Sequence, residues 1–456
     1  MGNGYLRNEN MAVEMQKDIL GGITSYNKFM TKDSGVYNVK DYQNDDLTYV
    51  LGNGTQDDTT GINKAILACP NYGTVYFPPT NGSFYNVTQL TIGPNKTGIH
   101  LVGAGLYESH IKFTGLVGFS CGSEMCCFSD MKVQGSATSI LAMTGTIMFK
   151  DTRNLTSADF DLNLSRCYIM EVECAIVSSG RGVLVDNCAF YHIYYTAIKA
   201  DFPPKFIAGP YDIHSAGGGF RGFIVRNSRF HYTECWIITN EGTNYLNLMG
   251  VLITGNQIEG PTCYIKGYVR DLEFSGNVHY QGGVGKDKLV HRALFDFIGG
   301  CDNVNIDINF RGKNPLWEIQ VGAVQVPPVA DAPQTDWCRR LIYTPASSPI
   351  INIRVTGVIS DVYYDIFDFN GGGRNIYLDI VADHIAIAAK ASYGYVNFRA
   401  GNYYGLMLSG VIESPEDLAV ERAATVFRAV RSAAVVKFYY LDFQINGLYK
   451  WYDGLN

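Results

Sequence analysis

Residues 53–105 read NGTQDDTTGINKAILACPNYGTVYFPPTNGSFYNVTQLTIGPNKTGIHLVGAG, and this stretch decides the fold. Asp57, Asp58 and Thr59 are candidate N-cap residues, because their side-chain oxygens can accept the free N–H groups of a first helical turn. Apolar residues then recur at three- and four-residue spacing and predict a short helix that stops at Pro70; they are Ile62, Ala65, Ile66 and Cys69.

The period of the pattern changes after Gly73. Thr74–Phe77 is predicted to be a strand, Pro78 and Pro79 force a turn, and Ile99–Val102 is a second strand. One short helix followed by many short strands indicates a lid on the end of a stack of strands.

This stretch resembles the opening of the pectate-lyase-like right-handed β-helices, especially phage tailspikes and related polysaccharide depolymerases. The matching residues are Gly54, Thr55, Asp57, Asp58, Thr59, Thr74 to Pro79 and Gly103 to Gly105. Asn53 stands where Asp is usual, and Gln43 to Gly52 replaces a short Gly-rich link. The resemblance implies an all-β fold, a right-handed parallel β-helix of three-strand coils with an N-terminal capping α-helix.

The composition suits a β-rich protein with a large core. The 456 residues are 46% hydrophobic and 17% charged, with 31 Tyr, 24 Phe and 49 Gly, which argues against disorder. The net charge of -7 disfavours nucleic acid as a partner, because nucleic-acid binding needs basic patches. We expect no signal peptide, since residues 1–10 lack a basic stretch followed by an apolar run, and no membrane insertion, since no run of 18 apolar residues exists.

The eleven cysteines show no paired metal-ligand spacing. We interpret them as small buried hydrophobic residues that stay reduced, in preference to disulfides or metal ligands. No cofactor and no metal are expected.

A unit recurs from about Leu155 onward: an alternating β-rich run and then a bend. The predicted bends are Asn187, Asn227, Asn256, Asn277, Asn309, Thr356, Val381, Val411 and Leu441, at steps of 40, 29, 21, 32, 47, 25, 30 and 30 residues. A minimum step of 21 with variable excess fits coils of three strands whose turns accept insertions. Asn side chains at bends can bond their own turn or stack as an amide ladder.

Four segments are predicted. They are an N-terminal segment or virion-attachment remnant (1–36), the capping helix with the first coil (37–110), the β-helix body with its insertions (111–413), and a terminal coil with a short C-terminal cap (414–456). Residues 414–417 read SPED, a capping box that predicts a short helix ending near Ala424.

The longest insertions, Phe202 to Gly219 and Arg311 to Ser348, are the predicted working surface, because loops on a rigid solenoid usually carry the site. If the coils that begin at Asn187 and Asn227 are aligned without gaps, Asp201 lies over Glu241. Such a pair suits a glycosidase, in which one carboxyl must stay protonated near neutral pH.

We therefore predict a carboxylate cluster as the catalytic group, while noting that any one of its members is more often a solvated turn residue. The candidate catalytic residues are Glu234, Glu241, Asp201 and Asp212. The candidate substrate-binding residues are His214, Tyr195, Tyr211, Trp236, His231, Arg221 and Lys199.

A second mechanism stays open. His192 and His231 flank a Phe shared by the two coils and are expected on opposite faces. A histidine or tyrosine base beside Lys199 or Arg221 would suit β-elimination from a uronic acid, although a lone histidine is usually structural.

The resemblance implies a phage depolymerase that cleaves a bacterial capsule or O-antigen, with hydrolysis favoured over elimination. It also implies a homotrimer that is joined to other tail or baseplate proteins through its N-terminus and is located in the virion, acting outside the host cell. The alternative from another class is a non-catalytic glycan-binding virion protein.

Overall fold

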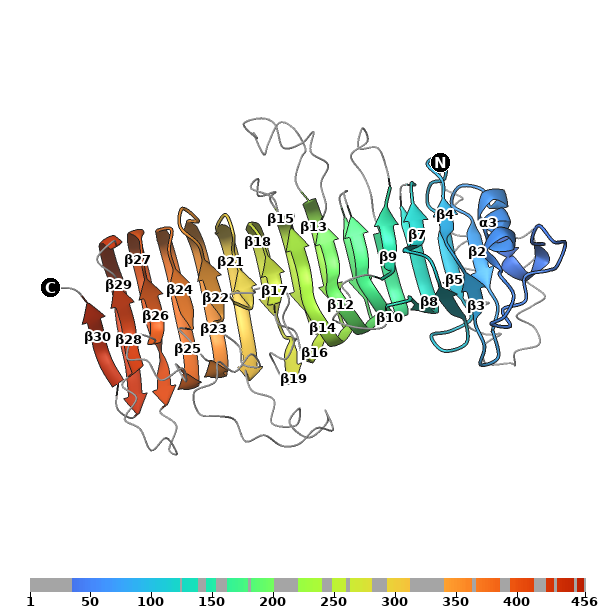
Figure 1. Cartoon of the computed structure of the whole chain (residues 1–456). Coiled ribbons are helices and arrows are strands. Elements are labelled where there is room, and N and C mark those ends of the chain that lie inside the picture. The colour runs from blue at the N-terminus through green and yellow to red at the C-terminus, as the bar shows by residue number, and fades with distance from the viewer. Residues whose placement is uncertain are drawn as a thin grey trace, which may run out of the picture.

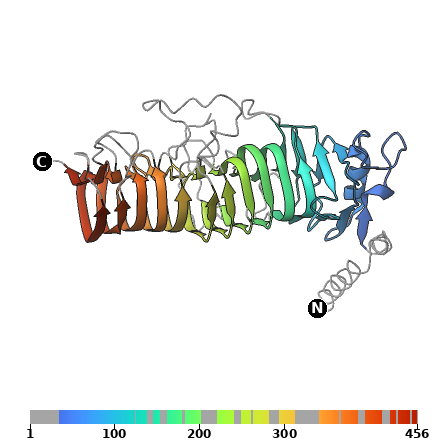
Figure 2. The same cartoon turned by 90° about the horizontal axis from the view of Figure 1, so that it is seen from below.

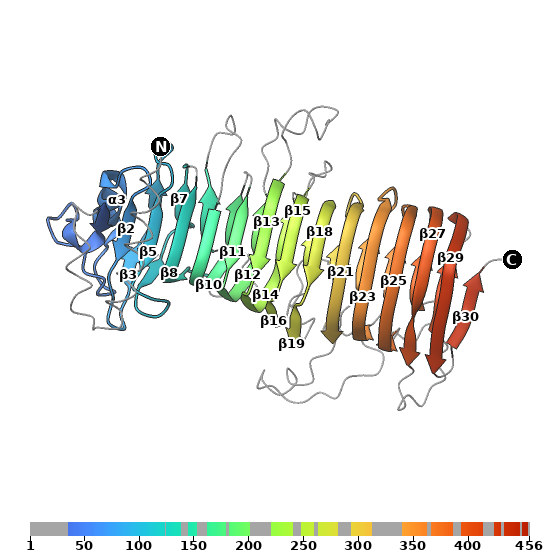
Figure 3. The same ribbon diagram turned by 180° about the vertical axis from the view of Figure 1, so that it is seen from behind.

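The computed structural model describes residues 35–123, 125–137, 145–152, 162–178, 182–200, 220–239, 248–259, 263–280, 293–311, 340–362, 366–385, 394–413, 424–429, 433–446 and 449–454. These residues form one elongated stack of strands that lie across the long axis, with a helix at the N-terminal end (Figure 1). The view from below in Figure 2 shows the same succession of coils from blue to red, and the view from behind in Figure 3 shows it from helix α3 to strand β30.

Two helical segments, η2 (Val39–Asp41) and α3 (Thr59–Ala68), precede the first complete coil. The first strands are β1 (Val36–Asn38), β2 (Thr74–Phe77), β3 (Tyr85–Val87), β4 (Leu90–Ile92), β5 (His100–Gly103), β6 (His110–Phe113), β7 (Val117–Cys121), β8 (Cys126–Gln134), β9 (Ile147–Asp151) and β10 (Leu162–Ser178). The middle strands are β11 (Val183–Asp186), β12 (Ala189–Ala200), β13 (Phe220–Arg226), β14 (Arg229–Thr239), β15 (Leu248–Thr254), β16 (Gln257–Glu259), β17 (Cys263–Lys266), β18 (Val269–Ser275), β19 (Val278–Tyr280) and β20 (Phe295–Asp296). The last strands are β21 (Cys301–Arg311), β22 (Ile342–Thr344), β23 (Ile350–Val362), β24 (Phe367–Phe369), β25 (Gly373–Ile385), β26 (Gly394–Phe398), β27 (Gly401–Glu413), β28 (Ala424–Ala429), β29 (Ala433–Asn446) and β30 (Tyr449–Gly454).

The pairings define three parallel sheets that run the length of the molecule. The first sheet begins β1–β2–β5–β8–β10, the second β3–β6–β8–β10–β12–β14, and the third β4–β7–β9–β10–β12–β14. Long strands such as β10 bend at corners and so belong to more than one sheet. The predicted right-handed parallel β-helix is confirmed, and each coil advances the stack by about 4.8 Å.

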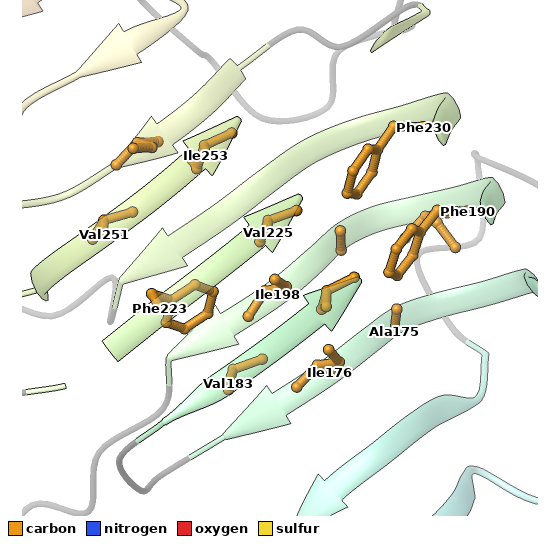
Figure 4. Close-up of a cluster of buried hydrophobic side chains, with 14 of the residues drawn as sticks. Ala175, Ile176, Val183, Phe190, Ile198, Phe223, Val225, Phe230, Val251 and Ile253 are labelled. Atoms are coloured by element: carbon orange, nitrogen blue, oxygen red, sulfur yellow. The ribbon is translucent and has the colours of Figure 1, made fainter. Parts of the chain in front are cut away.

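The core is a column of inward-facing side chains, in which equivalent positions of successive coils stack. Phe190 and Phe230 lie parallel with ring centroids 4.5 Å apart (Figure 4). Phe119 and Phe149 form a second stacked pair at 5.1 Å. Such stacks explain why Phe recurs at the same position of successive coils: each ring covers the ring of the coil before it.

The capping helix is confirmed at α3. All four residues of the predicted stripe are at most 1% exposed and pack on the first coil. Of the two aspartates expected to cap the helix, Asp57 accepts the Thr59 amide at 3.0 Å and Asp58 does not. The Asp58 carboxylate is buried and accepts the amides of Leu51 and Gly52 instead, so it holds the preceding loop.

Part of the predicted spacing is confirmed by the strand register. Phe190 pairs with Phe230 at the predicted step of 40, Gln257 with Val278 at 21, and Val381 with Val411 at 30. The step of 29 is wrong by one, since Arg229 pairs with Gln257. The steps of 47 and 25 are each wrong by two and the last step of 30 by three, since Asn309 pairs with Val358, Thr356 with Asp379 and Val411 with Gln444.

The early bends are also confirmed. Asn187 and Asn227 adopt the left-handed conformation at corners, with φ of 53° and 52°. Asn256 and Asn277 form a buried amide ladder, in which Asn277 Oδ1 accepts from the backbone and side-chain amides of Asn256 at 3.1 and 2.9 Å.

The later bend positions, Asn309, Thr356, Val381, Val411 and Leu441, lie inside long strands that themselves turn at corners. Gly357, which follows Thr356, and Gly410, which precedes Val411, have φ of 125° and 145°. The left-handed residues Asn303, Asn352 and Asn375 mark another corner of these coils, at the register position of Asp271.

Among the residues that the structure describes, the prediction of reduced, mostly buried cysteines is confirmed. Eight cysteines in the described part of the chain are free thiols, and seven of them are buried. Within the same residues, no helix is long and apolar enough to cross a membrane. The predicted C-terminal helix falls on residues 414–423, outside the described residues, and Ala424 begins strand β28.

Candidate functional site

Strand β12 carries a bulge that neither neighbouring strand shares. On one side, Val172 pairs with Ile193 and Cys174 with Thr196; on the other, Ile193 pairs with Thr233 and Thr196 with Cys235. Two tyrosines, Tyr194 and Tyr195, therefore oppose a single residue on each side. That residue is Glu173 in β10 and Glu234 in β14.

Bulges of this kind re-aim side chains and are common beside active sites. Here the bulge lies between two strands that each carry a glutamate at the same register position. The two strands are two rungs apart, or about 9.6 Å at 4.8 Å per rung. The predicted catalytic residue Glu234 thus has a counterpart, Glu173, on the other side of the bulge.

Glu173 is half-buried and has the environment of a proton donor. Burial raises the pKa of its carboxyl above the ordinary value, while the Gly145 amide and the charge of Lys199 act in the opposite direction. The Gly145 N–H donates to Glu173 Oε2 at 3.0 Å. A carboxyl with a raised pKa retains its proton closer to neutral pH, as a general acid requires.

A strained corner lies two residues before Glu173. Glu171 in β10 and His192 in β12 both have φ of 54° and occupy equivalent positions on neighbouring rungs, since Met170 pairs with Tyr191. Left-handed backbone is uncommon for residues other than glycine and often marks functional sites. The charge of Glu171 acts to raise the pKa of His192, but burial and the nearby His231 outweigh it and lower that pKa.

A hydrogen-bond chain fixes the Glu171 carboxylate. The His110 ring lies with Nε2 at 2.9 Å from Gln134 Oε1, and Gln134 Nε2 donates to Glu171 Oε2 at 2.6 Å. The chain crosses three coils, from β6 through β8 to β10. A side-chain amide of the preceding coil therefore fixes one carboxyl oxygen of Glu171, whereas Glu173 accepts from a backbone amide.

A row of rings leads to this corner, with Tyr107 in the turn before β6 and the other three on the outer face of the second sheet. Successive ring centroids are 6.2 Å apart for Tyr107 and Tyr168, 6.4 Å for Tyr168 and Tyr191, and 4.8 Å for Tyr191 and His231. The last pair is stacked, with an interplanar angle of 15°. We call these four residues the ring row; flat side chains on an outer face can stack on sugar rings.

The structure describes only part of the predicted site. Lys199 and His231 lie in β12 and β14, beside the bulge and in the ring row. The backbone positions of three more predicted residues are given by their strands: Tyr195 in β12, Trp236 in β14 and Arg221 in β13. Five predicted residues lie outside the described residues: Asp201, Asp212, His214, Tyr211 and Glu241.

The alignment that paired Asp201 with Glu241 assumed no gap between the two coils, and this assumption is wrong. Beyond the bulge, Ile198 pairs with Ile237 rather than Ile238, and Lys199 with Ile238. The extra residue in β12 shifts every later pair by one. The two carboxylates themselves lie outside the described residues.

The expectation that His192 and His231 lie on opposite faces is also wrong. Both rings contact Tyr191, with centroid distances of 4.0 and 4.8 Å. The left-handed conformation of His192 turns its side chain to the same side as its neighbours. Burial lowers the pKa of His231, and the charge of Arg229 adds to this.

Sequence reasoning missed Glu171, Glu173 and Gln134. The available signal was Met170-Glu171-Val172-Glu173-Cys174, where two acids alternate with residues suited to a core strand. Alternation places both acids on the outer side of the sheet, but their burial and partners come from other coils.

The described residues contain no group of three or more His, Cys, Asp and Glu side chains that could hold a metal ion. The chemistry that these residues offer is proton transfer between carboxyls and imidazoles, with rings and ammonium groups to position a ligand.

Together, the fold and this site define a class: a parallel β-helix protein with a carboxylate and aromatic cluster on its outer surface. The sequence matches no protein-family model, and the comparison with curated proteins finds no match.

Several solved structures are similar in fold. They include PfbA, a surface adhesin of Streptococcus pneumoniae (15% identity, TM-score 0.45, covering 92% of this chain and 93% of that chain). Others are the DFA-IIIase of Arthrobacter chlorophenolicus A6 (11%, 0.44, 88% and 93%) and a family 28 exopolygalacturonase of Yersinia enterocolitica (11%, 0.41, 92% and 79%). At these scores the similarities carry no argument about the site, which rests on the residues of this chain.

Proposed function

We propose that the protein binds and cleaves a bacterial surface polysaccharide, capsule or O-antigen, by glycosidic hydrolysis. The observation that carries this proposal is Glu173, a half-buried carboxyl of raised pKa that faces a two-tyrosine bulge. The ring row beside it would hold the sugar chain.

In this mechanism Glu173 protonates the leaving glycosidic oxygen, and a second carboxylate activates water on the opposite face of the sugar. Glu234 is the proposed base, because it occupies the same register position two rungs away. Two rungs separate the backbone positions of the two glutamates by about 9.6 Å, and in inverting glycosidases the two carboxyl groups lie roughly 6.5–9.5 Å apart. The proposal therefore favours inversion at the anomeric carbon.

The proposal extends to the biological setting that the opening motif implies. The protein would act as a tailspike-type depolymerase in a phage virion, as a homotrimer that is attached to other tail proteins through its N-terminal segment. This part rests on residues 53–105 and is tested by electron microscopy of virions with antibody against the chain.

The catalytic test compares Glu173→Gln, Glu234→Gln and Glu171→Gln on a panel of capsular and O-antigen polysaccharides. We expect Glu173→Gln to lower the cleavage rate by about 10²- to 10⁴-fold, the usual contribution of a general acid, with binding retained. Asp442→Asn, an exposed carboxylate of another sheet that accepts from the Tyr440 hydroxyl, is the matched control. Full cleavage by Glu173→Gln would refute the assignment.

A second candidate is β-elimination, which the lowered pKa values of His192 and His231 favour. A lowered pKa disfavours the imidazolium form, as a general base requires, and Lys199 is on the adjoining sheet. An ultraviolet absorbance from unsaturated uronate that grows as chains shorten would identify this reaction. Binding without shortening of any chain would identify a glycan-binding protein.

A further inference from the structure

Three cations lie on the outer face of the second sheet together with the ring row. Lys112 is in β6, Lys132 in β8 and Arg229 in β14. Lys132 pairs with Tyr168 in the register, and the same row continues through Ala189 to Arg229. We call these three residues the cation row.

Each member of the cation row contacts a neutral group. Lys112 Nζ lies 5.2 Å from the ring centroid of Phe84, and Lys132 Nζ lies 5.8 Å from that of Tyr168. Arg229 Nε donates to Gln257 Oε1 at 3.0 Å. Among the described residues, none of the three forms an ion pair.

Arginines at the corners of the first sheet behave differently. Arg166 donates to both oxygens of Asp130 at 2.6 and 2.7 Å, and Arg226 donates to Asp186 at 2.9 Å. Those charges are neutralised within the fold. The cation row keeps its charge for a ligand, on a chain whose net charge is -7.

We propose that the polysaccharide held on this face is anionic, with its acidic groups seated on the cation row and its sugar rings on the ring row. The inference rests on the proposed function and names the substrate class of the same site. Aromatic stacking alone would accept neutral sugars equally well, whereas three unneutralised cations select for negative charge.

The spacing indicates a polymer rather than a single sugar. Three rungs separate Lys132 from Arg229, or about 14 Å along the axis. The ring row covers the same interval, since Tyr168 and Tyr191 lie on the rungs between them. A ligand that reaches both cations must run along the axis of the β-helix, and it then meets the corner of Glu171 and Glu173.

The test measures binding of polygalacturonate, a linear polymer with one carboxylate per sugar, and of its carboxyl-reduced form of matched length. At low salt the wild-type chain should bind the carboxylated polymer more tightly, and salt at about 0.5 M should abolish the difference, because screening weakens exposed charge pairs. Lys132→Gln and Arg229→Gln should each weaken binding of the carboxylated polymer by about two- to fivefold, the range for an exposed ion pair.

Lys437→Gln is the matched control. Lys437 Nζ lies 5.8 Å from the Tyr404 ring, the same distance as in the Lys132–Tyr168 contact, but on the first sheet. This variant should bind as the wild type does.

Equal affinity for the two polymers, or no measurable binding of either, would overturn the inference, as would unchanged binding in the Lys132→Gln and Arg229→Gln double variant. These outcomes are separate from failure of the proposed function. If the protein cleaved a neutral polysaccharide and this cleavage required Glu173, the proposed function would be supported and the proposed preference for anionic polysaccharide would be refuted.

Discussion

His110 shows how a single buried side chain connects the site to pH. Its ring is held between Phe84, at a centroid distance of 5.6 Å, and the Gln134 amide. Burial lowers the pKa of His110 to about 4, with the charge of Lys132 in the same direction. Folding therefore opposes protonation of this imidazole.

The sign of the pH dependence follows from this shift. Between about pH 6.5 and pH 4 the unfolded chain binds a proton at His110 that the folded chain does not. The stability associated with neutral His110 is complete above about pH 6.5 and is lost as the pH falls to about 4. Because His110 is partly exposed, solvent screening reduces the effect, and we expect the free energy of unfolding to fall by about 1–2 kcal/mol over this range.

His110→Gln removes the titrating group and can keep a hydrogen bond to Gln134. In urea unfolding at about pH 7 and about pH 4.5, on either side of the ordinary histidine pKa, the variant should lose less stability on acidification than the wild type. Identical losses for both proteins would show that other groups account for the pH dependence.

At the scale of elements, the bulge in β12 organises the site. It exists because β12 has two residues between Ile193 and Thr196 where β10 and β14 have one between the paired positions, and parallel pairing resumes on both sides of it. The extra residue changes the register of everything that follows in the strand. Pairs predicted by counting from the start of the coil, such as Ile198 with Ile238, are therefore misplaced by one position.

The later strands depend on close backbone contact at glycine. Gly357 in β23 has a φ of 125°, and a Cβ atom there would lie 1.9 Å from the Ile308 carbonyl oxygen of the adjacent strand. Both the strained φ and the contact exclude a larger residue. We expect Gly357→Ala to destabilise the fold by about 3 kcal/mol or more.

Gly82→Ala is the control for this variant. Gly82 also has a positive φ, 84°, but a Cβ atom added there would have no heavy atom within 4 Å. Gly82→Ala should lower the free energy of unfolding by only about 1–2 kcal/mol, the cost of placing an alanine in left-handed backbone. Equal losses of thermal stability in the two variants would show that backbone contact in β23 contributes nothing.

At the scale of the whole molecule, each coil contacts chiefly its neighbours, so damage should stay local. The C-terminal half contains a buried ion cluster on the third sheet, in which Asp368 is fully buried. Arg399 donates to both oxygens of Asp368 at 2.6 and 2.7 Å, and Arg340 Nε lies 3.0 Å from Oδ2.

Asp368→Asn should destabilise the coils around β24 by about 2–4 kcal/mol, because it leaves guanidinium groups without a buried counter-charge. Hydrogen exchange should accelerate in β22, β24 and β26, whereas the core around Phe128 keeps its protection. Asp186→Asn, at the exposed Arg226 pair, should cost less than about 1 kcal/mol. Uniform acceleration along the whole chain would contradict local coupling.

Much of the architecture followed from local pattern. The stripe from Ile62 to Cys69, the strand at Thr74–Phe77 and the step from Phe190 to Phe230 are all set by side-chain periodicity. Periodicity records which side chains face the core, and every coil must fill the same cross-section. The sequence alone therefore determined the β-helix, its cap and its early coil spacing.

The tertiary structure decided the site. The bulge at Tyr194 and Tyr195 is a difference in length between neighbouring strands, so it has no signature within either strand. The raised pKa of Glu173 arises from burial against other coils, and the Glu171 carboxylate is fixed by Gln134 from the preceding coil. Charge, burial and register at a point on a β-helix depend on residues tens of positions away, and only the stacked coils bring those residues together.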